Sequence, residues 1–500
     1  MSRPSSKPAY TTPDSVGADI RATEVRRAYA PGWREVQVSL LILMLAVASD
    51  RFSLPVPGTD INIRLEFVIG GILAAWWPVR LVPGGGLAEK LRRAGVIELC
   101  LAGWLAVGVI SSLWFSPAPH ENLRLALVQA GLLGLYGVAF LLLGSARAVV
   151  WSALIWVLVG TGVAALGLTA ALAYTLFGLT EGITLSVEGN YEAGIFTITS
   201  KVHSTMWEPN IFGSFCLATG LLAFTLSLAP VQAFRRSRWQ GFFSVAVVLA
   251  ACGVVISMTR TAWLAGVLLA VGAMLIALRL RITSLHRLAW GLVLPMLAGT
   301  ALGLVVGFSM PAVIWEAGGG QSYTPAQVEQ ILRDALAHPD TARQVPGSIS
   351  RGSALGNRAE GVVHPETATS YVGRRQIYMA ALQKWLQHPL LGWGVGAYGV
   401  IIEKNGWLPN LELRVLLDTG VVGLLLLALA GGAAVLRAGR ALLVPPARWD
   451  SLHFALFGLL LGSAGLLIAY QLTDGTWLGF TWVYFAMLVA GGRFAGSEGA

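Results

Sequence analysis

Residues 373–423 read GRRQIYMAALQKWLQHPLLGWGVGAYGVIIEKNGWLPNLELRVLLDTGVVG, and this stretch decides how the rest of the 500-residue chain is arranged. It begins with Arg374 and Arg375 and continues with apolar residues at helical spacing. The glycine-rich turn 392–396 follows, and a long apolar run begins at Val415. Two arginines and a glycine-rich turn just before a membrane-length run are suited to holding an anionic, lipid-linked molecule at a membrane surface.

The composition indicates a membrane protein. The chain is 55% hydrophobic and only 12% charged, with a mean hydropathy of +0.67, whereas soluble domains carry roughly 25% charged residues. Its apolar runs lack the two-residue alternation of strands, and lipid accepts only helices or closed barrels. We therefore predict an all-α polytopic membrane protein with about twelve transmembrane helices and a large outer loop before the tenth.

The apolar runs divide the chain into segments. We predict a disordered tail at 1–34, helices 1–9 at 35–309 with an outer loop at 178–210, a large outer loop with amphipathic helices at 310–414, helices 10–12 at 415–492, and a second tail at 493–500. Within the first outer loop, alternating polar and β-prone residues around Glu188–Asn190 predict a small hairpin.

Orientation follows from the basic residues, which account for the net charge of +9. They gather in alternate short loops, where cytoplasmic ends of spans carry them. The residues concerned are Lys90, Arg92, Arg93, Arg235, Arg236, Arg238, Arg279, Arg281, Arg287, Arg437, Arg440 and Arg448. This pattern predicts that both termini are cytoplasmic, and it explains the charge without nucleic-acid binding. The three cysteines lie in predicted spans without metal or disulfide spacing.

Several polar residues share the predicted outer membrane face, where charge is costly and therefore indicates function. They are Lys201, His203, Glu208, Asn210, Arg260, Arg374, Arg375, Glu412, Arg414 and Asp418. Each also has a structural interpretation. Arg260 can extend along a helix end toward water, Glu208 can cap a helix, and Asp418 can pair with Arg414 four residues earlier.

At these residues the chain resembles the O-antigen ligase and polymerase superfamily. Its motifs occur in the expected order between about 201 and 423. An acidic-Pro-Asn segment spans Trp207–Gly213, and a Ser-x-x-Arg turn spans Ser257–Ala265. A Gly-Arg…Pro-Leu-x-Gly-x-Gly segment and a final Asn…Gly-x-x-Gly motif follow; their matching residues are Gly373, Arg374, His388–Gly396, Asn410, Gly420 and Gly423.

The resemblance implies a membrane glycosyltransferase of the bacterial inner membrane. Enzymes of this superfamily take a glycan from undecaprenyl diphosphate at the periplasmic face and pass it to a glycan, lipid or protein acceptor, in contact with membrane lipids. They need no metal or other cofactor. By the resemblance, Arg260, Arg374, Arg375 and Lys201 would bind the diphosphate, and Asn210 and Asn410 would contact the substrate elsewhere.

One position departs from the superfamily, because Pro409 replaces the histidine of its last motif. Proline offers no base or donor. Glu412, which follows most closely, is the first candidate for general base, and the alternatives are Asp418, Glu208 and His203. The substitution favours a polymerase or a polysaccharide ligase over a lipopolysaccharide ligase. A transporter or flippase of a lipid-linked or anionic substrate, or an inactive assembly partner, stays open.

Overall fold

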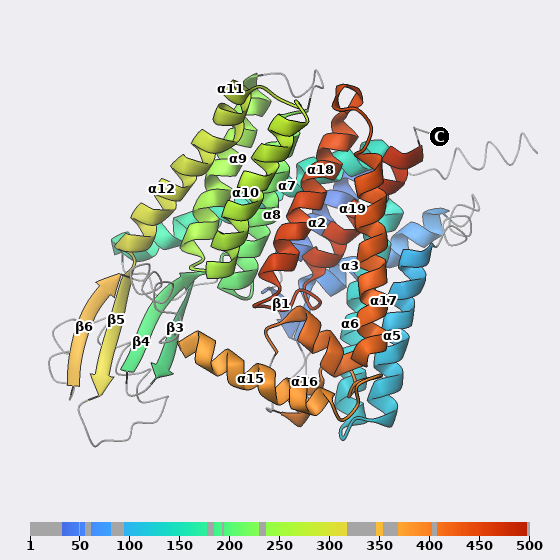
Figure 1. Cartoon of the computed structure of the whole chain (residues 1–500), viewed down its shortest axis with the longest axis vertical. Coiled ribbons are helices and arrows are strands. Elements are labelled where there is room, and N and C mark those ends of the chain that lie inside the picture. Colours follow the sequence, from blue (N-terminus) through green and yellow to red (C-terminus); the bar gives the residue numbers. More distant parts are fainter. Residues whose placement is uncertain are drawn as a thin grey trace, which may run out of the picture.

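The structure is a computed structural model. It describes residues 33–49, 51–55, 62–81, 95–177, 185–192, 195–229, 237–317, 347–353, 369–402 and 408–497. They form a helical bundle with a small sheet and two further helices at one end (Figure 1). Residues 1–32 of the predicted tail, and 318–346 and 354–368 of the large loop, lie outside the described residues.

Every predicted apolar run is helical, which confirms the all-α polytopic class. The first group of helices is α2 (Trp33–Val47), α3 (Leu65–Leu81), α5 (Val96–Trp114), α6 (Pro119–Leu142) and α7 (Ala146–Phe177). The second group is α8 (Pro209–Ser227), α9 (Ser237–Ile256), α10 (Arg260–Arg279), α11 (Leu285–Leu288), a π-helix (Ala289–Val293), α12 (Leu294–Ser309), α17 (Leu411–Ala441), α18 (Ser451–Ala469) and α19 (Gly479–Ser497). Among the described residues, nine helices are long and apolar enough to cross a membrane.

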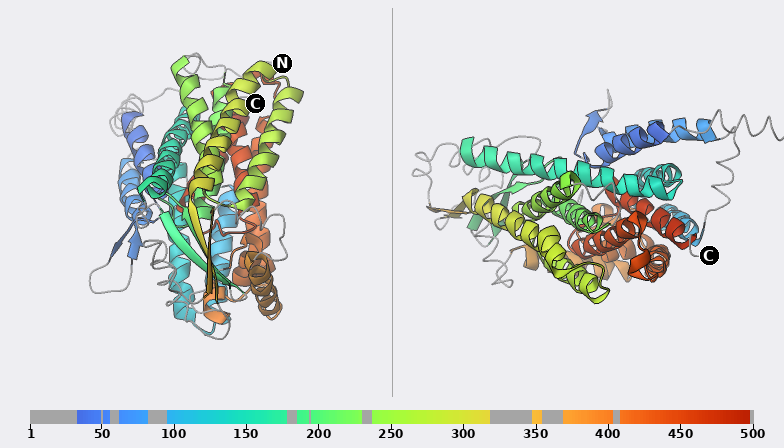
Figure 2. Two further views of the ribbon diagram at one scale, coloured as in Figure 1. Left: turned by 90° about the vertical axis from the view of Figure 1, so that its left-hand side faces the viewer. Right: turned by 90° about the horizontal axis from the view of Figure 1, so that it is seen from above.

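α8 lies at the centre of the bundle, and 83% of the residues in its apolar span are buried. α8 packs between α9 and α18, and α7 lies between α2 on one side and α8 and α9 on the other. Figure 2 shows the same order from above, with α2 and α3 at one edge and α12 at the other. The cysteines Cys100, Cys216 and Cys252 are buried and free, as their positions in apolar runs predicted.

Glycines decide which helices approach closely. A side chain at Gly299 or Gly303 of α12 would collide with Val248, Ala251 or Val255 of α9. Small residues four apart are the usual device for tight helix contact in membranes. α12 is therefore held against α9, whereas α10 packs mainly on α18.

The sheet joins two segments that are far apart in the chain. It is antiparallel and four-stranded, in the order β3 (Leu185–Glu192), β4 (Ile195–Val202), β5 (Pro311–Ala317) and β6 (Gly347–Ser353). The predicted hairpin is confirmed, but its turn follows Glu192, because Glu188 pairs with Thr199 inside the ladder. β5 and β6 show that the large loop contains strands in addition to the helix α15. A short hairpin, β1 (Ser53–Pro55) and β2 (Asn62–Arg64), precedes α3.

Several predicted boundaries move. The predicted amphipathic helix of the large loop appears as α15 (Thr369–Trp385), and α16 (Ala397–Ile401) follows the glycine-rich turn. α17 begins four residues before the predicted start at Val415, and α2 includes Arg34, which was predicted to lie in the tail. α19 continues to Ser497, because Arg493 is fixed to Glu98 of α5 by a 2.9 Å ion pair.

Candidate functional site

The glycine-rich turn 392–396 packs against α17 where the helix is interrupted at Gly420. Gly392, Gly394, Gly396 and Gly420 all have positive φ, between 64° and 103°, which side chains disfavour. The Trp393 and Gly394 amides donate to the carbonyl oxygens of Leu417 and Asp418 at 2.9 Å. The turn is thus an integral part of the start of α17, and its glycines allow this close packing.

Asp418 of α17 holds this turn in place through hydrogen bonds. Its Oδ2 accepts from the Gly396 amide and its Oδ1 from the Ala397 amide, both at 3.0 Å. The Arg414 Nε also donates to Asp418 Oδ2, at 3.3 Å, so the predicted pair is present. Arg414 Nη1 pairs as well with Asp474, which is fully buried. Because both oxygens of Asp418 are occupied, the structure gives this carboxylate a positioning role.

Asn410 and Glu412 lie together where α17 begins. The Asn410 Oδ1 accepts from the Leu413 amide at 2.8 Å, so Asn410 is the N-cap of the helix. Glu412 Oε1 accepts from Gln471 Nε2 at 2.7 Å. Its other oxygen, Oε2, is buried and has no hydrogen-bond partner among the described residues. One carboxylate oxygen of Glu412 is therefore buried without a hydrogen-bond partner among the described residues, whereas Asn410 acts as a cap.

The turn between α9 and α10 brings Arg260 to the start of α8. The hydroxyl of Thr259 donates to Asn210 Oδ1 at 3.2 Å and to the Pro209 carbonyl at 3.3 Å, and Met258 has a positive φ of 57°. This contact joins the acidic-Pro-Asn motif to the Ser-x-x-Arg motif. Asn210 thereby orients the turn, and Arg260 is the first residue of α10.

Arg374 of α15 completes a cluster at this point. It is half-buried, and its charge acts on Arg260 as a like charge. Burial lowers the pKa of Arg374 from its ordinary value, while the nearby Tyr378 and Glu208 raise it. We call Arg260, Arg374 and Glu208 the arginine cluster. Among the described residues, two guanidinium groups thus lie near one carboxylate, a composition that suits an anionic ligand.

Tyr378 connects the arginine cluster to the start of α17. Its hydroxyl donates to the Pro409 carbonyl at 2.8 Å and contacts the Gln471 carbonyl at 3.4 Å. Burial raises the pKa of Tyr378, and the nearby Arg374 lowers it, so the ring lies beside that guanidinium. Gln471 in turn binds Glu412. Residues from four motifs are thereby connected around Tyr378, which no motif of the sequence singled out.

The remaining predicted residues lie elsewhere around the same end. Lys201 and His203 are buried where β4 leads toward α8. The His203 Nδ1 is 3.1 Å from Nη1 of Arg51. Arg375 is exposed, on a different side of α15 from Arg374. The structure therefore separates the two neighbouring arginines that the sequence treated as a pair.

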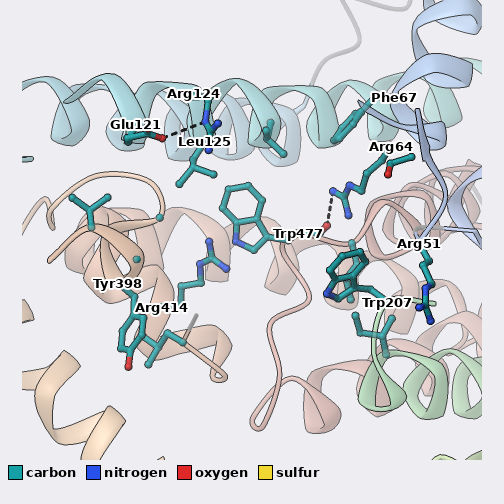
Figure 3. A pocket seen from close by; sticks show the side chains of 18 of the residues that line it. Arg51, Arg64, Phe67, Glu121, Arg124, Leu125, Trp207, Tyr398, Arg414 and Trp477 are labelled. Carbon is teal, nitrogen blue, oxygen red and sulfur yellow. Dashed lines mark hydrogen bonds and ion pairs between the residues drawn. The ribbon is translucent and has the colours of Figure 1, made fainter. Parts of the chain in front are cut away.

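A cavity of about 860 Å³ opens at this end of the bundle. Four arginines line it, with one carboxylate, Glu121, and several aromatic side chains; they are Arg51, Arg64, Arg124, Arg414, Phe67, Trp207, Tyr398 and Trp477. Figure 3 shows Arg414 beside Trp477, with the guanidinium carbon 4.4 Å from the ring centre. Arg64 donates to the Trp477 carbonyl at 2.9 Å and pairs with Glu66 at 3.1 Å.

The cavity and the arginine cluster share two walls. Trp207 and Ile211 line the cavity, while Glu208 between them lies near Arg374. Leu408 and Arg414 line it too, and Pro409 between them accepts from Tyr378. Sequence reasoning missed most of the cavity, because Arg51, Arg64 and Arg124 lie in the N-terminal part of the chain outside any motif. The preference of arginine and tryptophan for recognition surfaces was the only available signal.

The comparison with family models agrees with this geometry. Residues 245–428 match the model described as O-Antigen ligase. The comparison with curated proteins gave no match. The matched segment contains Arg260, Arg374, Glu412 and Asp418, while Glu208 and the other residues before 245 lie outside it. Over residues 245–428, this chain is therefore similar to the O-antigen ligase family, as the ordered motifs predicted.

Proposed function

We propose that this protein transfers or polymerises a glycan taken from an undecaprenyl-diphosphate donor, in the biosynthesis of a cell-surface polysaccharide. The observation that carries the proposal is the arginine cluster. Arg260 and Arg374 come from segments more than a hundred residues apart, yet they meet within one family domain, beside a membrane-length helix. A diphosphate offers the charge and the geometry that two guanidinium groups bind best.

In the reaction, an acceptor hydroxyl forms a bond to the anomeric carbon of the donor glycan. The bond from that carbon to the diphosphate oxygen breaks, and undecaprenyl diphosphate leaves with the electron pair. Arg260 and Arg374 stabilise the negative charge that grows on the leaving oxygen. Their mutual repulsion, partly offset by Glu208, is relieved by the anion.

The hydroxyl proton passes to a general base, for which we propose Glu412. Its Oε2 is buried without a hydrogen-bond partner among the described residues, and Gln471 orients the other oxygen. Asp418 has both oxygens occupied, Glu208 balances Arg374, and His203 is held by Arg51. Glu412 thus fits the place that Pro409 leaves vacant in the last motif better than the other three candidates.

We propose that the 860 Å³ cavity accepts the glycan next to the reacting bond. Its exposed Trp207 and its Trp477 offer flat apolar faces, and its arginines offer fixed donors for hydroxyl or acidic groups. Pockets that combine aromatic walls with a few placed polar groups are typical binding sites. The cavity is large enough for several sugar rings on this scale, so it fits a glycan and not only a single sugar.

The reaction would take place at the periplasmic face of the bacterial inner membrane, with residues 310–414 contributing to the substrate region. The sheet, α15 and α16 lie at one end of the bundle, and Arg279, Arg281 and Arg440 lie at helix ends opposite (Figure 1). On intact spheroplasts, an impermeant thiol reagent should label Ser348→Cys and not Ser237→Cys. Labelling of Ser237→Cys would reverse the orientation.

A direct test is incubation of the purified protein, in vesicles, with an undecaprenyl-diphosphate-linked oligosaccharide and candidate acceptors. New glycosidic bonds with release of undecaprenyl diphosphate are expected. Movement of the lipid-linked oligosaccharide across the vesicle without bond formation would instead indicate a flippase. Neither outcome, in protein that is folded, would indicate an assembly partner without activity.

A further inference from the structure

Three exposed arginines surround the turn between α10 and α11, at the end of the bundle opposite the sheet (Figure 1). Arg279 is the last residue of α10, Arg281 lies in the turn, and Arg287 lies in α11. Within the described parts of the chain, none of the three has an ion pair or a side-chain hydrogen bond. From residue 209 to residue 315 the sequence contains no aspartate or glutamate. We call these three arginines the basic turn.

Arg281 occupies a backbone position that favours glycine. Its φ is +53°, in the left-handed region. The Arg281 amide donates to the Leu278 carbonyl at 3.0 Å, and the Ile282 amide donates to the Ala277 carbonyl at 2.9 Å. These are the two bonds of a Schellman ending, in which the left-handed residue is usually glycine because a side chain is disfavoured there. The preference for basic residues on one side of a membrane would be met by an arginine anywhere in the turn, so it does not explain this position.

The basic turn lies between two exposed apolar faces. On α10, Leu275 is 58% exposed, and Arg279 follows four residues later on the same face. Beyond the turn, Trp290 of the π-helix is 62% exposed, and Leu294, four residues later in α12, is 44% exposed. Tryptophan and arginine are the residues expected where the hydrocarbon meets the lipid heads. The basic turn therefore lies where the membrane surface meets two lipid-facing helices.

We propose that the basic turn binds the head of an anionic phospholipid, whose acyl chains lie on the exposed faces of α10 and α12. Arginine is well shaped to bind a phosphate group. The apolar residues on both sides would contact acyl chains, which a free phosphate lacks. Basic sites at the ends of membrane helices are typical binding sites for anionic lipid heads. With the orientation proposed above, this lipid belongs to the cytoplasmic leaflet.

This inference is independent of the proposed donor site, because Arg260 begins α10 and Arg279 ends it. The test uses phosphatidylglycerol with a photoreactive group near the start of an acyl chain, added to the purified protein in nanodiscs of phosphatidylcholine. The probe should label peptides between Leu275 and Leu294. Excess phosphatidylglycerol should abolish that labelling, whereas excess phosphatidylcholine or inorganic phosphate should not. Labelling that resists phosphatidylglycerol, or that inorganic phosphate abolishes, would overturn the proposal.

Paired variants separate this site from general surface charge. Arg281→Gln combined with Arg287→Gln should reduce the labelling about tenfold, because each basic residue near the surface adds attraction for an anionic lipid. Arg440→Gln combined with Arg448→Gln is the matched control. Both residues are exposed, and the change removes the same charge from the ends of other helices. The control should leave the labelling unchanged, and an equal loss in both pairs would overturn the proposal.

A single variant separates lipid binding from folding. Arg281→Gly relieves the left-handed backbone, so the melting temperature should stay the same or rise. Labelling by the phosphatidylglycerol probe should nevertheless fall several-fold, because one of the three cations is lost. Unchanged labelling in Arg281→Gly would overturn the proposal, since the arginine would then have no part in lipid binding.

Discussion

Arg414 and Arg374 lie at the same end of the bundle, but their surroundings differ. Arg414 is buried between two carboxylates, Asp418 and Asp474, and its ring neighbour is Trp477. Arg374 is beside another arginine, Arg260, with Glu208 nearby. An arginine with two acids has its charge satisfied within the fold, and removing it leaves buried charge behind. Two neighbouring arginines gain most from an anion supplied from outside. We therefore propose that the first group contributes stability and that the second binds the donor.

The largest effect is expected at the start of α17. Glu412→Gln should reduce transfer about hundred- to ten-thousandfold, because a general base is lost, while thermal stability and donor binding stay near wild type. Adding Pro409→His in that background should restore part of the activity. Asp418→Asn is the contrasting variant and should mainly lower stability. A normal rate in Glu412→Gln would remove this residue from the mechanism.

The Arg414 network provides the next largest effect. Arg414→Ala should destabilise the protein by about 3–5 kcal/mol, because Asp474 is left buried without its partner. Arg124→Ala is the control on the wall of the same cavity. Its ion pair with Glu121 is 59% and 53% exposed, so about 0–1 kcal/mol is expected. If Arg414→Ala lowered the melting temperature no more than Arg124→Ala does, the buried network would add no stability beyond that of an exposed ion pair.

A smaller effect separates two adjacent arginines of α15. Arg374→Ala should lower the rate of transfer about ten- to hundredfold, because charge-assisted contacts are worth roughly 1.5–3 kcal/mol. The exposed Arg375→Ala should lower it much less. Arg374→Lys should recover part of the loss, since charge returns without the planar fork. Equal losses at Arg374 and Arg375 would mean that general surface charge, and not the arginine cluster, attracts the donor.

Sequence reasoning succeeded where one physical rule controls the outcome. Lipid requires long apolar helices, so the spans from α2 to α19 could be predicted, and the pairing of Arg414 with Asp418 follows from their spacing. The ordered motifs also placed Arg260 and Arg374 at one face. These predictions depend on local periodicity and on known motifs, which a single sequence displays directly.

Other features depend on contacts between distant segments, which periodicity does not encode. β4 pairs with β5 more than a hundred residues later, and nothing in Pro311–Ala317 signals a partner. Asp474 lies in a loop without a motif, yet it satisfies Arg414. Asn410 resembles a substrate residue in sequence, but its cap is visible only once α17 begins at Leu411. Periodicity likewise does not show that α10 packs mainly on α18 and α12 mainly on α9.

The central claim is that Arg260 and Arg374 together bind a polyprenyl diphosphate. Its most direct test is equilibrium binding of undecaprenyl diphosphate to the purified protein and to Arg260→Ala and Arg374→Ala, with each variant shown to be folded. We predict binding that weakens with salt and falls about ten- to hundredfold in either variant. Wild-type affinity in both variants would contradict the account.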